Sequence, residues 1–208
     1  MYLDISSNQG EIDWQAVKTN EGINGVILRA TTKNNLLDVR TIQNYNGILH
    51  NMSDVDEISV YKFSYARDYI GARIECRKCL DELNKHGVHF DYFYLDLEGW
   101  GGRDYTREEC NAVILGYMDE INANLADFGK LRLYYNYNYL KNIIDPYWRQ
   151  FPTWLARYNS AIGDTFGANV VLWQYTSTGH VNGINGNVDI SREVDNANLC
   201  FPLGGDGD

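Results

Sequence analysis

Short runs of apolar and aromatic residues alternate along this chain with longer segments whose apolar residues recur at helical spacing. Runs of about four to eight such residues predict strands, and a period near 3.6 predicts amphipathic helices. The predicted strands cover residues 2–6, 25–30, 58–64, 92–98, 131–136, 153–157, 170–175 and 187–190. The predicted helices lie between the first six strands, near residues 12–20, 37–50, 68–86, 106–128 and 139–149.

The helix near residues 106–128 has the clearest start signal. Thr106 and Glu109 form a capping-box pair, in which each side chain bonds a backbone N–H of the first turn. Apolar residues then follow one face of this helix, at Cys110, Val113, Ile114, Tyr117, Ile121 and Leu125. The pattern therefore predicts a helix with one buried side.

After the sixth strand the helical patterns stop, and residues 160–168 and 176–186 are predicted loops rich in Gly, Ser and Asn. Strands that alternate with helices predict a parallel sheet with right-handed crossovers, and eight strands can close into a barrel. We therefore expect a single-domain α/β fold, a reduced TIM-like barrel of eight mostly parallel strands with about five helices. Residues 1–200 should form this barrel, and residues 201–208 a linker or tail.

Composition and charge narrow the class of protein. The 208 residues carry a formal net charge of −10, which argues against nucleic acid because phosphate binding needs clustered Lys and Arg. No segment approaches the length of a membrane span, so we expect no membrane insertion, and no pattern indicates a protein partner. Aromatic residues make up 13% of the chain, and their flat rings suit both sugar faces and ordinary cores.

The cysteines are predicted to be structural. Cys76 and Cys79 form a CxxC motif, but they fall within the predicted helix at 68–86, and no second Cys or His pair completes a tetrahedral metal site. We expect these thiols, with Cys110 and Cys200, to be reduced and without disulfides. The sequence predicts no cofactor.

Two carboxylates stand at the end of the apolar run that begins at Tyr92. Asp96 and Glu98 are two residues apart, so in a strand they share one face, about 6–7 Å apart along the backbone. One interpretation is a strand end that reaches solvent with two surface acids. The other is a catalytic pair, because glycoside hydrolysis needs one protonated carboxyl to donate to the leaving oxygen and one ionised carboxylate.

Two further acids are expected in the same place. Asp4 lies on the polar face of the first predicted strand, and Asp189 lies in the last one. Barrel closure puts the first strand beside the eighth, so Asp4 and Asp189 should be neighbours, with Asp96 and Glu98 across the barrel mouth. Crowded acids with low-dielectric walls raise at least one carboxyl pKa, which keeps a Glu protonated as a general acid.

Clustered carboxylates also suit a metal ion. Sites of that kind usually recruit a histidine or a calcium-loop spacing. The histidines of this chain do not follow the strand ends, at His50, His86, His89 and His180. We therefore expect no metal site.

Taken together, four stretches make the chain resemble the family 25 glycoside hydrolases, the Chalaropsis-type lysozymes found among phage endolysins and bacterial muramidases. They are LDISSNQG followed by IDW within residues 3–14, DLE at 96–98, PTWLARY at 152–158, and LWQYT at 172–176 leading to GNVD at 186–189. The stretches follow the family's order over nearly the whole chain. One loop departs from the family, because Thr32-Lys33 follows Ala30-Thr31 where Glu-Gly is common.

The resemblance implies a flattened barrel that cleaves the β-1,4 bond after N-acetylmuramic acid in bacterial peptidoglycan. By position, Glu98 would be the general acid and Asp96 its partner, while Asp4 and Asp189 would line the floor. Asp96 would either attack the anomeric carbon or orient the substrate's 2-acetamido group as the nucleophile, and we favour the second route. Residues at strand ends are candidates for sugar contact, at Tyr61, Tyr65, Tyr135, Trp154 and Gln174.

Two other functions stay open. A family 18 chitinase-like hydrolase also ends a barrel strand with acids, but Tyr94 stands where its Asp-x-x-Asp-x-Asp-x-Glu signature has Asp. A non-catalytic peptidoglycan-binding barrel would not need a proton donor. Residues 1–5 carry no basic, apolar leader, so we expect no signal peptide, synthesis in the cytoplasm and release to the cell wall by another route, such as a phage holin. A wall-binding module would attach after residues 201–208.

Overall fold

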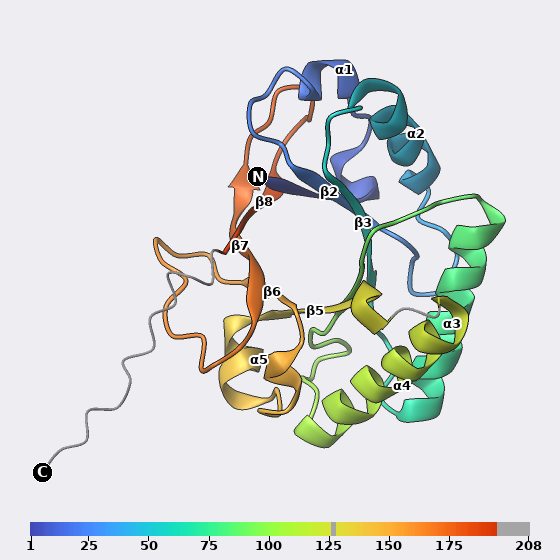
Figure 1. The fold of residues 1–208 in the computed structure, drawn as a ribbon, viewed down its shortest axis with the longest axis vertical. Helices are drawn as coiled ribbons and strands as arrows, with labels where there is room; N and C mark the ends of the chain where they lie inside the picture. Colours follow the sequence, from blue (N-terminus) through green and yellow to red (C-terminus); the bar gives the residue numbers. More distant parts are fainter. Residues whose placement is uncertain (126–127, 195–208) are drawn as a thin grey trace, which may run out of the picture.

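The computed structural model describes residues 1–125 and 128–194. Its strands close into one barrel in sequence order (Figure 1). They are β1 (Tyr2–Ile5), β2 (Gly25–Arg29), β3 (Glu57–Phe63), β4 (Phe93–Asp96), β5 (Leu131–Asn136), β6 (Thr153–Ala156), β7 (Val170–Gly179) and β8 (Val188–Glu193). The predicted single-domain, eight-stranded α/β barrel is confirmed.

Seven strands run parallel to one another, and β8 runs antiparallel to both of its neighbours. The reason is the connection between β7 and β8, which spans only residues 180–187 and is too short for a crossover helix. β8 then closes the barrel against β1, with Asp4 directly opposite Asp189. The prediction that Asp4 and Asp189 are neighbours is therefore confirmed.

Five α-helices lie within the described residues, as predicted: α1 (Trp14–Val17), α2 (Thr41–Asn51), α3 (Tyr69–Lys85), α4 (Arg107–Leu125) and α5 (Tyr137–Asn142). Short 3₁₀ turns accompany them at η1 (Ser7–Gln9), η2 (Phe128–Lys130) and η3 (Trp148–Gln150). α3 and α4 pack side by side against the barrel (Figure 1). The capping box of α4 is present, with Glu109 N–H 3.2 Å from Thr106 Oγ1 and Thr106 N–H 2.9 Å from Glu109 Oε2.

Some predicted boundaries were wrong. The helix predicted at 139–149 splits into α5 and η3, because Pro146 lacks a backbone N–H and disfavours helix in the residue before it. The helix predicted from residue 37 begins at Thr41, and residues 31–40 form a loop. The loop predicted from residue 176 is strand as far as Gly179, since the Thr- and Ser-rich end of β7 pairs with β8.

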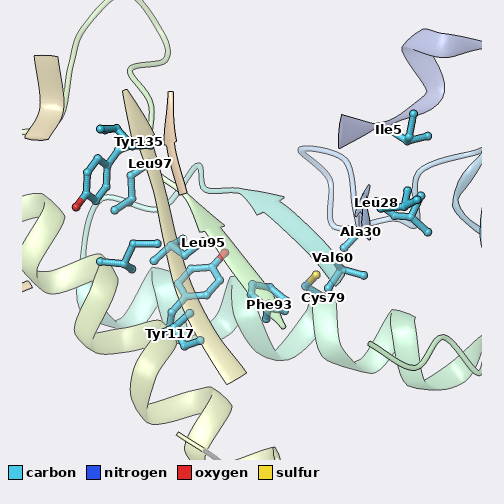
Figure 2. Packing of buried hydrophobic residues seen from close by; sticks show 14 of the residues in the cluster. Ile5, Leu28, Ala30, Val60, Cys79, Phe93, Leu95, Leu97, Tyr117 and Tyr135 are labelled. Atoms are coloured by element: carbon cyan, nitrogen blue, oxygen red, sulfur yellow. The ribbon is translucent and has the colours of Figure 1, made fainter. Parts of the chain in front are cut away.

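Alternate residues of each strand pack into two separate apolar layers. Leu3, Ile5 and Leu95 point outward into the core between barrel and helices, which Figure 2 shows around α3 and α4. Tyr2 and Tyr94 point inward and pack in the barrel interior. The strand alternation read from the sequence is therefore confirmed, and it aims the acids of β1 and β4 into the barrel.

Trp154 fills the middle of the barrel. Its ring centroid lies 4.5 Å from Tyr134 and 5.3 Å from Tyr94, and its Nε1 donates to Ser191 Oγ at 2.8 Å. The side chain is 1% exposed. The interior is thus a packed core that supports the barrel mouth from below.

A buried polar network joins β3 to the helices. Glu75 of α3 accepts hydrogen bonds from Ser64 Oγ and Tyr117 OH, both at 2.8 Å, and from the backbone N–H of Tyr65 at 3.0 Å. Lys62 Nζ lies 3.7 Å from Glu75 and donates to the carbonyl of Thr32 at 2.8 Å. This network fixes the loops after β2 and β3.

Cys76, Cys79 and Cys110 are free, buried thiols, in agreement with a structural role. Cys200 and the expected linker at 201–208 lie outside the described residues. Among the helices that the structure describes, none has both the length and the apolar character that crossing a bilayer requires.

The close approach of α3 and α4 depends on Gly116. A Cβ at this position would lie 2.6 Å from the backbone oxygen of Tyr69 and 2.8 Å from Ala72 Cβ. We predict that Gly116→Ala lowers the free energy of unfolding by about 1–3 kcal/mol, although Ala favours helix. Gly71→Ala on α3 is the matched control, because its Cβ would meet nothing closer than 3.4 Å. Denaturant unfolding that found Gly116→Ala as stable as the control would contradict this packing.

Candidate active site

Four carboxylates converge at the mouth of the barrel. Asp4 comes from β1, Asp96 from the last position of β4, Glu98 from just beyond β4, and Asp189 from β8. All four line one cavity of about 320 Å³. The structure therefore brings together the acids that the sequence singled out, at the end of the barrel where parallel strands place functional groups.

Gln174 of β7 holds two of these acids. Its Nε2 lies 3.2 Å from Asp189 Oδ2 and 3.5 Å from Asp4 Oδ2. Its Oε1 accepts hydrogen bonds from Tyr134 OH at 3.0 Å and Tyr158 OH at 2.9 Å. Because the hydroxyls fix the amide orientation, the amide N–H groups point at the carboxylates.

Asp96 is the most deeply placed member of the acid pair. Its side chain is 5% exposed, and its Oδ1 has no hydrogen-bond partner among the described residues. Burial raises the pKa of Asp96 well above its usual range, and the charges of Glu98 and Asp4 raise it further. An unpartnered carboxylate oxygen in such a place is costly unless it is protonated or meets a donor.

Glu98 is half-buried and shares this environment. Burial raises the pKa of Glu98, and the charge of Asp189 adds to the effect. The charge of Glu98 in turn raises the pKa of Asp96. The pair therefore retains a proton at a pH where isolated carboxyls have lost theirs.

Asp4 and Asp189, the acids on the cavity floor, also have raised pKa values. Burial and the charge of Asp189 raise the pKa of Asp4, against the opposing charge of Arg29 and a hydrogen bond from Tyr61. Burial raises the pKa of Asp189. Like charges directly opposite each other in a sheet destabilise it, so this pairing indicates a functional constraint on the barrel seam.

Arg29 lines the cavity, and its positive charge favours the ionised form of Asp4. The sequence analysis did not identify it. Its Nε donates to Asp38 Oδ2 at 2.6 Å, and its Nη2 donates to Ser7 Oγ. Asp38 also accepts a hydrogen bond from the backbone N–H of Arg40 at 3.0 Å. Burial alone would raise the pKa of Asp38, but these hydrogen bonds outweigh burial and lower it. The available signal was strand alternation, since Ile27 and Arg29 share the inner face of β2.

The predicted sugar contacts divide into three groups. Tyr61 and Tyr65 line the cavity, as predicted. Trp154 and Gln174 are 1% and 0% exposed, so they lie beneath the mouth and support it. Tyr135 was wrongly placed at the mouth. It points outward into the core near Leu97 (Figure 2), and its hydroxyl bonds Thr153 Oγ1 at 3.1 Å.

Strand alternation explains the error at β5. Tyr134, one residue earlier, is the inward side chain, because β5 turns Leu131, Leu133 and Tyr135 toward the helices. Residues that the sequence analysis did not propose also line the cavity, including Phe63 and Lys33. In the described part of the chain, no group of three or more His, Cys, Asp or Glu side chains is arranged to hold a metal ion.

The raised pKa values give stability a defined dependence on pH. In the unfolded chain Asp96 ionises near pH 4, whereas in the fold it keeps its proton to higher pH, so the free energy of unfolding falls as pH rises through this window. We predict that Asp96→Asn raises the free energy of unfolding by about 1–2 kcal/mol at pH 7 and by much less near pH 4. Urea unfolding at both values measures the difference.

Glu109→Gln is the opposite control. Hydrogen bonds from Arg103 lower the pKa of Glu109 to about 2, so this carboxylate stabilises the fold above its unfolded pKa, and its loss should lower stability at pH 7. An equal gain for Asp96→Asn at both pH values, or a loss at pH 7, would rule out a destabilising buried charge.

Comparison with known proteins identifies the family of this chain. The family model for "Glycosyl hydrolases family 25" matches residues 3–184. The autolytic lysozyme of Clostridium acetobutylicum is 23% identical over 198 residues, which cover 91% of this chain and 54% of that protein. The modular autolysin LytC of Streptococcus pneumoniae superposes with a TM-score of 0.80 at 24% identity, covering 91% of this chain and 45% of LytC.

The CTP1L endolysin superposes with a TM-score of 0.75 at 25% identity, covering 94% of this chain and 66% of the endolysin. This chain thus spans about half the length of the lysozyme and of LytC. The family model, by contrast, matches most of this chain, over a range that contains Asp4, Asp96 and Glu98. The chain belongs to family 25 of the glycosyl hydrolases.

Proposed function

We propose that this protein is a lysozyme, an N-acetylmuramidase that hydrolyses the β-1,4 bond between N-acetylmuramic acid and N-acetylglucosamine in bacterial peptidoglycan. The observation that carries the proposal is the acid pair Asp96 and Glu98, which lies in a cavity with two further carboxylates and has raised pKa values. Two similar proteins support peptidoglycan as the substrate. One is the autolytic lysozyme of Clostridium acetobutylicum, and the other is LytC, which has been solved in complex with a synthetic peptidoglycan ligand.

Glu98 is the proposed general acid. It is half-buried, faces the cavity and keeps a proton because burial and Asp189 disfavour its ionised form. The proton passes to the glycosidic oxygen as the bond from that oxygen to the anomeric carbon breaks, and the electron pair of that bond leaves with the oxygen. The carboxylate that remains then accepts a proton from the water that completes hydrolysis.

Asp96 is the proposed partner in a substrate-assisted route. The oxygen of the 2-acetamido group attacks the anomeric carbon, and the acetamido nitrogen becomes positively charged in the cyclic intermediate. The unpartnered Oδ1 of Asp96 supports this role, because it lacks the hydrogen bond that an acetamido N–H would supply. Asp4, Asp189 and Gln174 would hold the local field and the position of the pair.

The identity of the products tests the bond assignment. We predict that digestion of purified peptidoglycan releases new reducing ends on N-acetylmuramic acid, because the bond after that sugar is cleaved. Borohydride labelling followed by acid hydrolysis identifies the labelled amino sugar. Label on glucosamine would refute the bond assignment. Retention of peptidoglycan and chitin without any cleavage would favour a binding barrel.

Replacement of Glu98 tests the proton donor. Glu98→Gln should keep the fold and lower kcat by about 10²–10⁴-fold, because general acid catalysis contributes that much. In the unmodified protein kcat/KM should fall as pH rises above the raised pKa of the pair, and the residual activity of the variant should lose this dependence.

The matched control is Glu108→Gln, an exposed glutamate at the start of α4 that lies outside the cavity lining. It should leave the rate unchanged. Near-normal turnover of Glu98→Gln with an unaltered thermal transition would remove Glu98 from the mechanism.

A further inference from the structure

Lys33 lies in the loop after β2 and lines the same cavity as the four acids. The loop is ordered by short contacts: Thr31 bridges Leu37 in antiparallel fashion, and Thr32 N–H donates to the carbonyl of Leu36 at 2.8 Å. From below, the buried Lys62 donates to the carbonyl of Thr32 at 2.8 Å. The backbone that carries Lys33 is therefore held in place.

The charge of Lys33 is not neutralised within the described residues. Two cationic side chains line the cavity, and one of them, Arg29, forms an ion pair with Asp38. Lys33 forms no ion pair with a described carboxylate. Its ammonium lies over two rings instead, 5.0 Å from the centroid of Trp100 and 5.5 Å from that of Tyr65.

Of these two rings, that of Tyr65 lines the cavity. Tyr65 and Trp100 pack edge to face with centroids 5.6 Å apart, and the Tyr65 backbone is bonded to Glu75. Arg67 donates a hydrogen bond to the carbonyl of Trp100 at 3.0 Å and holds the Trp100 backbone in place. A cation–π contact holds an ammonium without cancelling its charge, so the positive charge remains available to a ligand.

We propose that Lys33, held over Tyr65 and Trp100, forms a cationic subsite that binds a carboxylate of the glycan substrate beside the acid pair. This inference rests on the proposed hydrolysis of peptidoglycan. A cavity with four carboxylates repels an anionic glycan strand, and a single unneutralised cation on its wall offsets this repulsion where the strand's carboxylate lies. Peptidoglycan offers two sources, the lactyl group of a peptide-free muramic acid and the stem peptide.

The test compares Lys33→Gln with the unmodified protein on three purified substrates. They are peptide-free glycan strands prepared with an amidase, strands that carry their stem peptides, and peptide-free strands whose carboxylates have been converted to amides. We expect Lys33→Gln to raise KM by about fivefold to thirtyfold on a carboxylated substrate, with little change in kcat. On the amidated strands the two proteins should behave alike.

The first two substrates distinguish the source of the carboxylate. A larger KM on peptide-free strands supports the lactyl carboxylate, and a larger KM on peptide-bearing strands alone supports the stem peptide. Lys33→Arg should retain most of the affinity because it keeps the charge. The difference between Lys33→Gln and the unmodified protein should also shrink as salt screens the interaction.

Lys78→Gln is the matched control for net charge, since Lys78 is an exposed lysine of α3 outside the cavity lining. Equal losses for Lys33→Gln on amidated and carboxylated strands, or no loss on either carboxylated substrate, would overturn the proposal. Binding of the same strands to Glu98→Gln, with and without Lys33→Gln, gives a readout that does not require turnover. If the unmodified protein bound the strands in a Lys33-dependent way but did not cleave them, the proposed function would be refuted and the Lys33 subsite would still be supported.

Discussion

The crowding of four carboxylates on the inner wall of a closed barrel is the constraint on which the rest of this structure depends. Like charges at short range and burial both oppose ionisation, so the fold must supply compensating contacts. Gln174 supplies one by turning its amide N–H groups toward Asp4 and Asp189, while two tyrosine hydroxyls hold its oxygen. The same crowding, with burial, favours the protonated forms of Asp96 and Glu98.

Stability and chemistry occupy opposite faces of the same strands. In β4, Phe93 and Leu95 pack outward against the helices, whereas Tyr94 and Asp96 face the interior. A shift of one residue would exchange the two sets, so the outer core fixes which side chains reach the cavity. The barrel therefore positions its acids through packing that never touches a substrate.

Loop residues complete the lining of the cavity that the strand ends begin. The loop after β2 brings Lys33 to the cavity, and the segment after β4 brings the Trp100 ring to 5.0 Å from the Lys33 ammonium. Both are anchored by polar side chains, the loop after β2 by the buried Lys62 and the segment after β4 by the partly buried Arg67. Strand ends thus carry the proposed chemistry, and loop residues carry the proposed preference among substrates.

The sequence by itself determined the eight strands, the faces on which Asp4, Asp96 and Glu98 lie, and the pairing of Asp4 with Asp189, because alternation and closure follow from consecutive residues. It did not determine the inward choice of Tyr134 over Tyr135 or the contacts of Arg29 and Lys33. Those were decided by the tertiary structure. Gln174 and Asp4 are 170 residues apart in sequence, and only barrel closure brings their atoms within hydrogen-bonding distance.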